Sequence, residues 1–473
     1  MTLKYGSLLL LAALAAPAHA RDAAVVATDR GQVRGAIADG IASWKGIPFA
    51  APATGALRWR APQPAAAWRG VRNARAYGPD CAQVPFPSDA APLGTTPAED
   101  CFYANVWKPA GAGARRLPVI VWIYGGGFVN GGASPPTYAG ANLARQGVMV
   151  VSFNYRLGRL GTFALPQLTR ADADHGLIAN YLTMDQIAAL RWVRRNAAAF
   201  GGDPGNVTIV GESAGGMSVH TLVTAPLARG LFRKAVVMSG GDAQAMPVRL
   251  SDVEAMGADF ARGKGIDPAA PDALARLRAL PADRIVDGLN LATLAAALTP
   301  RPTITRPFPD GKVVVDSGAA YAAGRFVRVP MLIGATSADI GGVTGPMIAG
   351  ARSAAATISR AGAPVWAYRF SYVPESVRAP GAYHATDIPF FFDNQAIKYG
   401  AATTARDQAM GRTISAYLVN FAKRGDPNGP GLPAWPRYAA ATDQLMDFTP
   451  AATARAGRDP WGPQIDAAAT TVR

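Results

Sequence analysis

Cysteine and histidine are both scarce in this chain. Its 473 residues include 2 cysteines and 4 histidines, and 47 basic residues outnumber 32 acidic ones, which leaves a net charge of +15. The chain has no basic tail, no zinc-ligand spacing and no basic residues interleaved with aromatic ones. The sequence therefore predicts no metal site and no nucleic-acid partner. The arginines are scattered, so a basic protein with solvated charges is expected, and attraction to anionic surfaces or acidic substrates stays open.

Long apolar runs are missing as well. The run at residues 8–16 is too short to span a bilayer, and no other stretch is long enough, so no membrane anchor is expected. Lys4 precedes this run and the small residues Ala18 and Ala20 follow it, which is typical of a secretory signal peptide cleaved after Ala20. No twin arginine and no lipoprotein cysteine accompany it. We therefore expect residues 1–20 to be removed and the mature protein to be periplasmic or secreted.

The two cysteines are Cys81 and Cys101. An exported chain folds in an oxidising compartment, so we expect a single disulfide. It would close a loop of about twenty residues and contribute ~3 kcal/mol. Two buried free thiols are the alternative, which is less compatible with export.

Buried strands and helices alternate along the chain. This order predicts an α/β protein with a mostly parallel sheet and helices on both faces. The proline- and glycine-rich opening before the cysteine loop is expected to hold loops and edge strands. No internal repeat or linker is evident, so residues 21–473 are predicted to form a single domain. Strands are expected at residues 24–28, 32–35, 99–107, 117–124, 148–154, 207–210, 235–238, 329–334 and 365–372, and helices at 184–199, within 252–298, at 347–360 and at 409–423.

The strand at residues 207–210 leads directly into a serine between small residues. Residues 211–216 read Gly-Glu-Ser-Ala-Gly-Gly, and a helix-like run follows. A G-x-S-x-G pattern between a strand and a helix is the nucleophile elbow, in which a tight turn exposes the serine hydroxyl. A chance match in a glycine-rich chain is the alternative, but the flanking strand and helix favour Ser213 as a nucleophile.

A serine nucleophile needs a histidine base, and elimination leaves His384. His19 belongs to the predicted signal peptide, and His175 precedes the serine although the base follows it in chain order. His220 lies seven residues beyond Ser213, about 10 Å along the same helix and out of reach. His384 follows the strand at 365–372, in a loop of the kind that carries catalytic groups.

The acid of the triad is expected at Asp339. It lies just beyond the buried strand at 329–334, whereas Asp310 stands in a Pro-Asp-Gly turn and other candidates lie in polar helical stretches. Three consecutive glycines end the strand at 117–124 and let the backbone approach a bound group. We therefore expect the N–H groups of Gly126, Gly127 and Ala214 to form an oxyanion hole, with a flexible loop as the alternative for the glycines.

With these residues assembled, the chain resembles the type-B carboxylesterases, the family of cholinesterases and bacterial carboxylesterases. The resemblance implies an α/β-hydrolase fold, ester hydrolysis through an acyl-serine, no cofactor, and a disulfide between Cys81 and Cys101. It also implies a buried pair between Arg58 and Glu99, and supporting positions for Glu212 and Ser239 behind the triad. The stretches that carry it are residues 45–50, 99–107, 122–128, 153–158, 199–204, 211–216, 420–422 and 425–428.

Two departures from the family pattern concern the triad. The acid is aspartate, where many relatives have glutamate, although aspartate serves in other hydrolases. The interval from Asp339 to His384 is 45 residues (384 − 339), much shorter than usual in the family. One helix and one strand still suffice for a right-handed crossover. Helices that wall the pocket would be missing, so we expect a more open site or a damaged one.

The leading hypothesis is an exported carboxylesterase acting on a small-molecule ester. Its first alternative is a non-catalytic, cholinesterase-like binding or adhesion protein, since the family includes such members. A peptidase on the same fold is disfavoured because the motifs extend beyond the elbow. A true lipase is a narrower variant of the leading hypothesis, and the sequence shows no clear lid. The acyl group, the alcohol group and the oligomeric state do not follow from the sequence.

Overall fold

The computed structural model describes residues 24–86, 91–111, 113, 115–244, 246–299 and 301–471. The signal peptide predicted at residues 1–20 lies outside these residues. Across the described ranges, no helix combines the length and apolarity that crossing a membrane requires. The strands are β1 Val25–Ala27, β2 Gln32–Arg34, β3 Ala36–Ala38, β4 Ile41–Pro48, β5 Val71–Asn73, β6 Tyr103–Pro109, β7 Leu117–Ile123, β8 Met149–Phe153, β9 Gly202–Glu212, β10 Lys234–Met238, β11 Met331–Thr336, β12 Val365–Phe370, β13 Gln444–Phe448 and β14 Ala454–Arg458.

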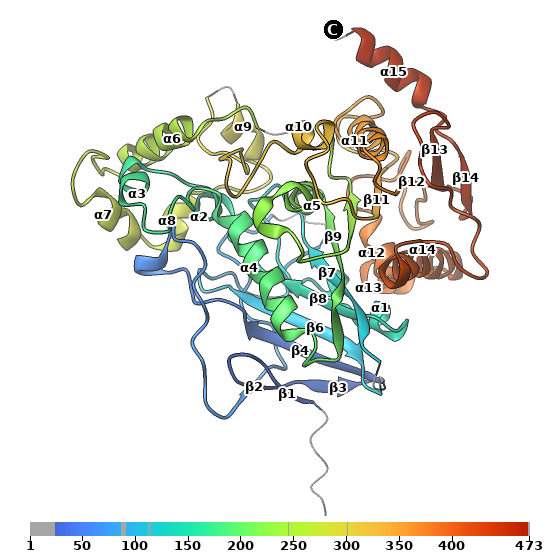
Figure 1. The fold of residues 1–473 in the computed structure, drawn as a ribbon, viewed down its shortest axis with the longest axis horizontal. Helices are drawn as coiled ribbons and strands as arrows, with labels where there is room; N and C mark the ends of the chain where they lie inside the picture. The colour runs from blue at the N-terminus through green and yellow to red at the C-terminus, as the bar shows by residue number, and fades with distance from the viewer. Residues whose placement is uncertain are drawn as a thin grey trace, which may run out of the picture.

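The helices separate and flank these strands (Figure 1). They are α1 Ala141–Arg145, α2 Gly158–Gly161, α3 Pro166–Ala171, α4 Tyr181–Asn196, α5 Ala214–Thr224, α6 Leu250–Gly263, α7 Ala273–Ala279, α8 Ala282–Val286, α9 Leu294–Leu298, α10 Ser317–Ala322, α11 Ile348–Arg360, α12 Ile388–Phe391, α13 Gln395–Tyr399, α14 Ala405–Arg424 and α15 Gly462–Thr471. Short 3₁₀ helices lie at Gly55–Leu57, Pro136–Tyr138, Pro226–Ala228 and Gly400–Ala402.

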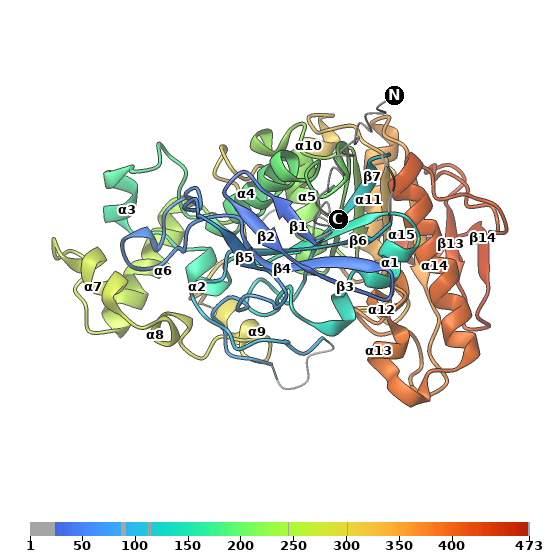
Figure 2. The same cartoon turned by 90° about the horizontal axis from the view of Figure 1, so that it is seen from below.

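An 11-stranded sheet forms the centre of the described chain, in the order β14-β13-β12-β11-β10-β9-β7-β8-β6-β4-β3. The run from β13 through β8 is parallel throughout, whereas β14, β6, β4 and β3 pair antiparallel with their neighbours. A second sheet joins β1, β2 and β5. Helices lie on both sides of the large sheet (Figure 2), so the predicted α/β class and mostly parallel sheet are confirmed.

The central strands are apolar because they are covered on both faces. Every residue of β8, β10, β11 and β12 is buried, as expected for parallel strands between two helical layers. Helix α5 packs against β9 and β10, and α14 packs against β7 and β9. This packing holds the carboxyl ends of β9, β10 and β11 side by side, where the loops that follow them can meet.

The structure corrects two expectations about the ends of the sheet. The opening of the mature chain was expected to hold edge strands, but β4 lies inside the large sheet between β3 and β6. Gly46 is tolerated because a register shift between Trp44 and Ile47 interrupts the ladder there, and Pro48 is the last residue of the strand. Strands β13 and β14 were not predicted, since β14 reads Ala-Arg-Ala-Gly-Arg and carries no apolar alternation.

A disulfide and an ion pair stabilise the segment between β5 and β6. Cys81 and Cys101 form a disulfide, as expected, and both are buried. The Arg58 guanidinium forms a two-pronged pair with Glu99, with both N–O distances 2.6 Å. Arg58 also donates to the carbonyl groups of Leu277 and Leu280, so it joins this segment to the end of α7.

Candidate active site

Ser213 occupies a sharp turn between β9 and α5. Its φ of 55° and ψ of −121° are unusual for a residue with a side chain. The flanking glycines are required because a Cβ at Gly211 would lie 2.2 Å from the Gly215 carbonyl oxygen, and one at Gly215 would lie 2.0 Å from the Ile123 carbonyl oxygen. The G-x-S-x-G pattern therefore reflects backbone crowding around one exposed hydroxyl.

The structure brings Ser213, His384 and Asp339 into one hydrogen-bonded chain. His384 Nε2 lies 2.8 Å from Ser213 Oγ, and His384 Nδ1 lies 2.6 Å from Asp339 Oδ1. The loops that carry the acid and the histidine are joined by a parallel bridge between Ala338 and Tyr383. This bridge shows how a segment of 45 residues places both groups at the same point.

Asp339 is held by donors on both carboxylate oxygens. Ser239 Oγ donates to Oδ2 at 2.6 Å, as does Thr336 Oγ1 at 2.9 Å, and the Ile340 N–H donates to Oδ1 at 2.8 Å. Burial raises the pKa of Asp339, but the hydrogen bond and charge of His384, with the Ser239 hydrogen bond, outweigh it and lower the pKa. The carboxylate is therefore ionised and fixed in orientation beside the imidazole.

Glu212 places a second carboxylate beside the imidazole. Its Oε1 atom lies 3.3 Å from His384 Nε2, the same nitrogen that faces Ser213. Burial lowers the pKa of His384, but the charge of Glu212 and the hydrogen bond and charge of Asp339 outweigh it and raise the pKa to about 9. The fraction of neutral imidazole, the form that can accept a proton, therefore grows as the pH rises through this value.

The three residues expected to supply oxyanion donors line the same cavity as Ser213. Gly126 and Gly127 have φ values of 97° and 63°, and Val129 and Asn130 donate to the Gly126 carbonyl oxygen. In the part of the chain that the structure describes, the N–H groups of Gly126, Gly127 and Ala214 donate to no protein acceptor. Three unengaged donors near the serine hydroxyl can bind a developing negative charge.

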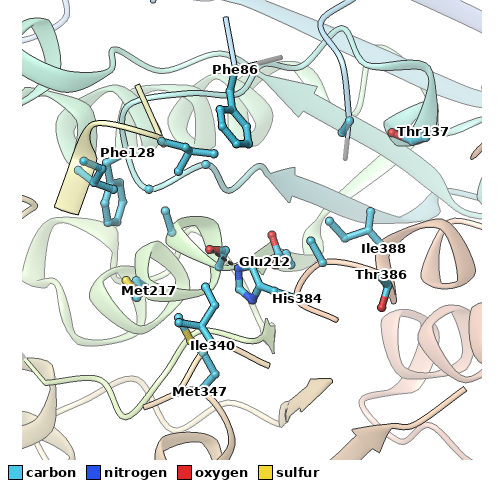
Figure 3. A pocket seen from close by; sticks show the side chains of 18 of the residues that line it. Phe86, Phe128, Thr137, Glu212, Met217, Ile340, Met347, His384, Thr386 and Ile388 are labelled. Atoms are coloured by element: carbon cyan, nitrogen blue, oxygen red, sulfur yellow. Dashed lines mark hydrogen bonds and ion pairs between the residues drawn. The ribbon is translucent and has the colours of Figure 1, made fainter. Parts of the chain in front are cut away.

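A cavity of about 590 Å³ extends to both sides of these groups. Figure 3 shows Phe128 and Met217 on one side of His384, and Thr137 and Ile388 on the other. The lining is largely apolar, which suits a small organic substrate. The lining also includes Leu291, Leu294 and Leu298, which pack in one cluster with Val129. Tyr138, Pro389, Tyr399 and the basic side chains of Arg306 and Lys398 line the cavity as well.

The remaining histidine and turn candidates lie elsewhere. His220 is buried and its Nδ1 atom lies 3.0 Å from the Tyr321 hydroxyl, so it does not contact Ser213. Asp310 Oδ1 accepts from the N–H groups of residues 312–314, which is the turn expected for it. Among the described residues, no cluster of three His, Cys, Asp or Glu side chains could hold a metal ion.

Sequence reasoning missed Asp387, a buried carboxyl near the triad. It is 0% exposed, its Oδ2 atom accepts from the Tyr368 hydroxyl at 2.9 Å, and its Oδ1 atom has no hydrogen-bond partner among the residues that the structure describes. Burial raises the pKa of Asp387 to about 7; the Tyr368 hydrogen bond opposes this, and the charge of Asp339 adds to it. Its position three residues after His384 was the one available signal, but nothing in the pattern reveals burial beside Tyr368.

Comparisons with known proteins agree with this geometry. The model of the carboxylesterase family matches residues 22–349 and 345–460. The para-nitrobenzyl esterase of Bacillus subtilis (strain 168) is 33% identical, over 89% of this chain and 94% of that protein. The fumonisin B1 esterase of Sphingopyxis macrogoltabida is 33% identical, over 89% and 85% of the two chains. A solved structure of PNB esterase superimposes with a TM-score of 0.82 at 30% identity, covering 94% of this chain and 98% of its own.

The family match spans most of the chain, and the named relatives cover most of their own length as well. The similarity therefore includes the sheet, the elbow and the loops that follow β11 and β12. The chain belongs to the carboxylesterase family, has the α/β-hydrolase fold and is a carboxylic ester hydrolase.

Proposed function

We propose that the enzyme hydrolyses small-molecule carboxylic esters with Ser213 as nucleophile, His384 as base and Asp339 as the acid that orients it. The observation that carries this proposal is the continuous hydrogen-bonded chain from Ser213 through His384 to Asp339. Nucleophile, base and acid within hydrogen-bond reach of each other are the geometric signature of a triad.

The reaction then proceeds in two halves. Ser213 Oγ attacks the ester carbonyl while His384 Nε2 accepts its proton, and the N–H groups of Gly126, Gly127 and Ala214 stabilise the oxyanion. His384 returns the proton to the departing alkoxide, which is released as the alcohol, and the acyl group remains bound to Ser213. Water, deprotonated by His384, attacks this ester, and the carboxylic acid departs as the proton returns to Ser213.

Supporting residues complete the site in this proposal. Ser239 holds the second oxygen of Asp339, and Glu212 stabilises the imidazolium that forms when His384 accepts the proton. The alternative of a non-catalytic binding protein has no need for this constellation. The bridge between Ala338 and Tyr383 supports an intact triad despite the short acid-to-histidine segment, because it aligns the two loops.

We also propose that residues 21–473 form one exported catalytic domain after removal of residues 1–20. The disulfide between Cys81 and Cys101 supports an oxidising compartment. Expression of the full chain with its own leader in a bacterial host tests this proposal. N-terminal sequencing of the protein from the periplasm or medium should begin at Arg21, and an uncleaved cytoplasmic protein would contradict it.

The activity is tested with p-nitrophenyl acetate, butyrate and octanoate and a Ser213→Ala control. We expect turnover by the wild-type protein and a loss of about 10⁴-fold or more in the variant. A fluorophosphonate should label the wild type once and leave Ser213→Ala unlabelled. Folded wild-type protein that neither hydrolyses these esters nor takes the label would favour the binding-protein alternative.

A further inference from the structure

A guanidinium lies in the wall of the catalytic cavity without a carboxylate partner. Arg306 lines the cavity together with Ser213. Its Nη2 atom lies 2.9 Å from Met246 Sδ and its Nη1 atom 3.9 Å from Met217 Sδ, whereas its buried Nε atom has no hydrogen-bond partner within the described part of the chain. Among the described residues it forms no ion pair, and thioether sulfur is a weak acceptor. The hydrogen-bonding capacity of this cation is therefore largely unused.

A partly buried guanidinium without an anionic partner lowers the stability of the folded protein. Burial lowers the pKa of Arg306, and the charge of Asp242 opposes this effect from a distance without forming an ion pair. The guanidinium remains charged at any ordinary pH. A desolvated charge that lacks a partner is destabilising, and a planar carboxylate that accepts two hydrogen bonds offsets much of that cost.

Arg306 is also close to the reacting bond. Met217 lies one turn beyond Ser213 on α5, since its N–H donates to the Ser213 carbonyl oxygen at 2.8 Å. Four residues of helix correspond to a rise of about 6 Å. Leu294, on the same side of the cavity, approaches Gly127, because a Cβ there would lie 2.6 Å from Leu294 Cδ2. The guanidinium therefore lies several carbon atoms from a carbonyl held at Ser213, in the wall of a largely apolar cavity.

We propose that Arg306 binds an anionic group of the substrate, so that the preferred esters carry a carboxylate several bonds from the ester carbonyl. The proposal rests on the esterase function and specifies its substrate class. The anionic group can belong to the acyl half, as in a half-ester of a dicarboxylic acid, or to the alcohol half. Lys398, which also lines the cavity, and the net charge of +15 attract anions as well, so the test separates Arg306 from both.

Matched substrate pairs isolate the effect of one charge. For the acyl half, monoethyl adipate is compared with ethyl adipamate, in which a carboxamide replaces the free carboxylate and the ester is kept. For the alcohol half, 4-acetoxybenzoate is compared with 4-acetoxybenzamide. At 0.15 M salt, where long-range attraction is screened beyond about 8 Å, we expect kcat/KM for one carboxylate to exceed that of its amide by about tenfold to a hundredfold. In Arg306→Gln this ratio should fall to near one, and Arg306→Lys should retain part of it.

Two variants control for other cations. Lys398→Gln removes the second basic group of the cavity, and Arg301→Gln removes an exposed arginine five residues before Arg306. Both should keep the preference for the carboxylate substrate. Three results would overturn the proposal. The ratio of kcat/KM for carboxylate over amide could be near one for both pairs in the wild type, it could persist in Arg306→Gln, or it could be lost in either control.

A binding measurement keeps this test independent of turnover. In Ser213→Ala, calorimetric titration should show the favoured carboxylate ester binding about tenfold more tightly than its amide. The double variant Ser213→Ala/Arg306→Gln should bind the two equally. Neutral esters that are hydrolysed without any carboxylate preference would refute the role of Arg306 and leave the esterase function intact. A binding preference without any hydrolysis would support Arg306 and refute the esterase function.

Discussion

At the scale of single residues, His384 is surrounded by more negative charge than a triad requires. Asp339 is hydrogen-bonded to one ring nitrogen, and Glu212 lies 3.3 Å from the other. The charge of the buried Asp387 also raises the pKa of His384. Stabilising the imidazolium lowers the barrier to proton transfer but reduces the amount of free base at neutral pH. The two effects can be separated by removing one carboxylate at a time.

Replacing Glu212 by glutamine should move the pH profile of the enzyme. The charge of Glu212 raises the pKa of His384, whose folded value is about 9, and the proposed mechanism requires the neutral ring. Activity therefore rises with pH through this value. In Glu212→Gln the acidic limb of kcat/KM should move down by about one pH unit or more. Initial rates on p-nitrophenyl butyrate between pH 5 and 10 measure it.

Glu375→Gln is the matched control for this prediction, because Glu375 is exposed on the same acid-to-histidine segment. Its profile should coincide with that of the wild type. An acidic limb that stays in place in Glu212→Gln would show that Glu212 does not set the protonation of His384.

Replacing Asp387 by asparagine should change how stability depends on pH. The pKa of Asp387 is raised from 3.8 to about 7 in the folded state, so the folded protein binds this proton more tightly than the unfolded chain. Its contribution to stability is complete below pH 4 and is lost as the pH rises to 7. An asparagine side chain cannot ionise, so we expect Asp387→Asn to be more stable at pH 8 by about 1–4 kcal/mol, with little gain at pH 4.

Urea unfolding of both proteins at pH 4, 6 and 8 measures this difference. Asp272→Asn, at an exposed aspartate, controls for the loss of one negative charge. A destabilisation by Asp387→Asn that is equal at all three pH values would mean that the carboxylate contributes by its hydrogen bond to Tyr368 alone.

At the scale of elements, the loop after β7 is shaped by contacts that leave no room for side chains. A Cβ at Gly126 would lie 2.3 Å from the Asn130 carbonyl oxygen, which belongs to the turn of the same loop. The φ of 97° at Gly126 is also unfavourable for any residue with a side chain. The two proposed oxyanion donors after β7, Gly126 and Gly127, therefore depend on one tightly closed loop.

Gly126→Ala should impair catalysis by displacing these donors. Because the contact is with backbone, the loop has to shift, and losing one oxyanion donor costs about 100-fold in kcat. Gly362→Ala is the control, since Gly362 has a φ of 89° but nothing within 4 Å of an added Cβ. We expect it to lose some stability and to keep its kcat. Equal kcat values for Gly126→Ala and Gly362→Ala would argue against Gly126 in the oxyanion hole.

At the scale of the whole molecule, the disulfide joins Cys81 to Cys101, and the described residues between them belong to no strand of the large sheet. The segment between Cys81 and Cys101 includes Phe86 and Ala91, which line the catalytic cavity. The cross-link limits the conformations of the unfolded chain and so favours the folded one. One wall of the cavity therefore depends on a covalent bond as well as on packing.

Removing this cross-link should lower stability. We expect Cys81→Ala/Cys101→Ala to lose about 3 kcal/mol of unfolding free energy, seen as a lower midpoint in guanidinium unfolding. Wild-type protein unfolded in the presence of dithiothreitol should show a similar loss, while the double variant should not respond to the reductant. An unchanged midpoint would indicate that packing alone holds the segment.

Much of the molecule followed from local pattern. The turn at Ser213 was predictable because neighbouring backbone forces glycine at 211 and 215, and β8 and β10 were predictable because both faces are buried. Strand β14 was not, because an exposed edge strand needs no apolar residues. His384 was predicted by elimination because the chain has only four histidines, and Asp339 was predicted from its place just beyond a buried strand.

The sequence by itself determined the elbow and the buried strands, because each depends on neighbours along the chain. It also predicted Ser213, His384 and Asp339 as the reacting groups, since few residues in the required chain order follow the elbow. Only the tertiary structure decided that a 45-residue segment aligns His384 with Asp339, since that depends on a bridge between two loops. It also decided that Asp387 is buried beside Tyr368 and that Arg306 lies among thioethers in the cavity. The burial of a polar side chain, and its lack of a partner among the described residues, depend on how distant segments pack together, and no local pattern encodes them.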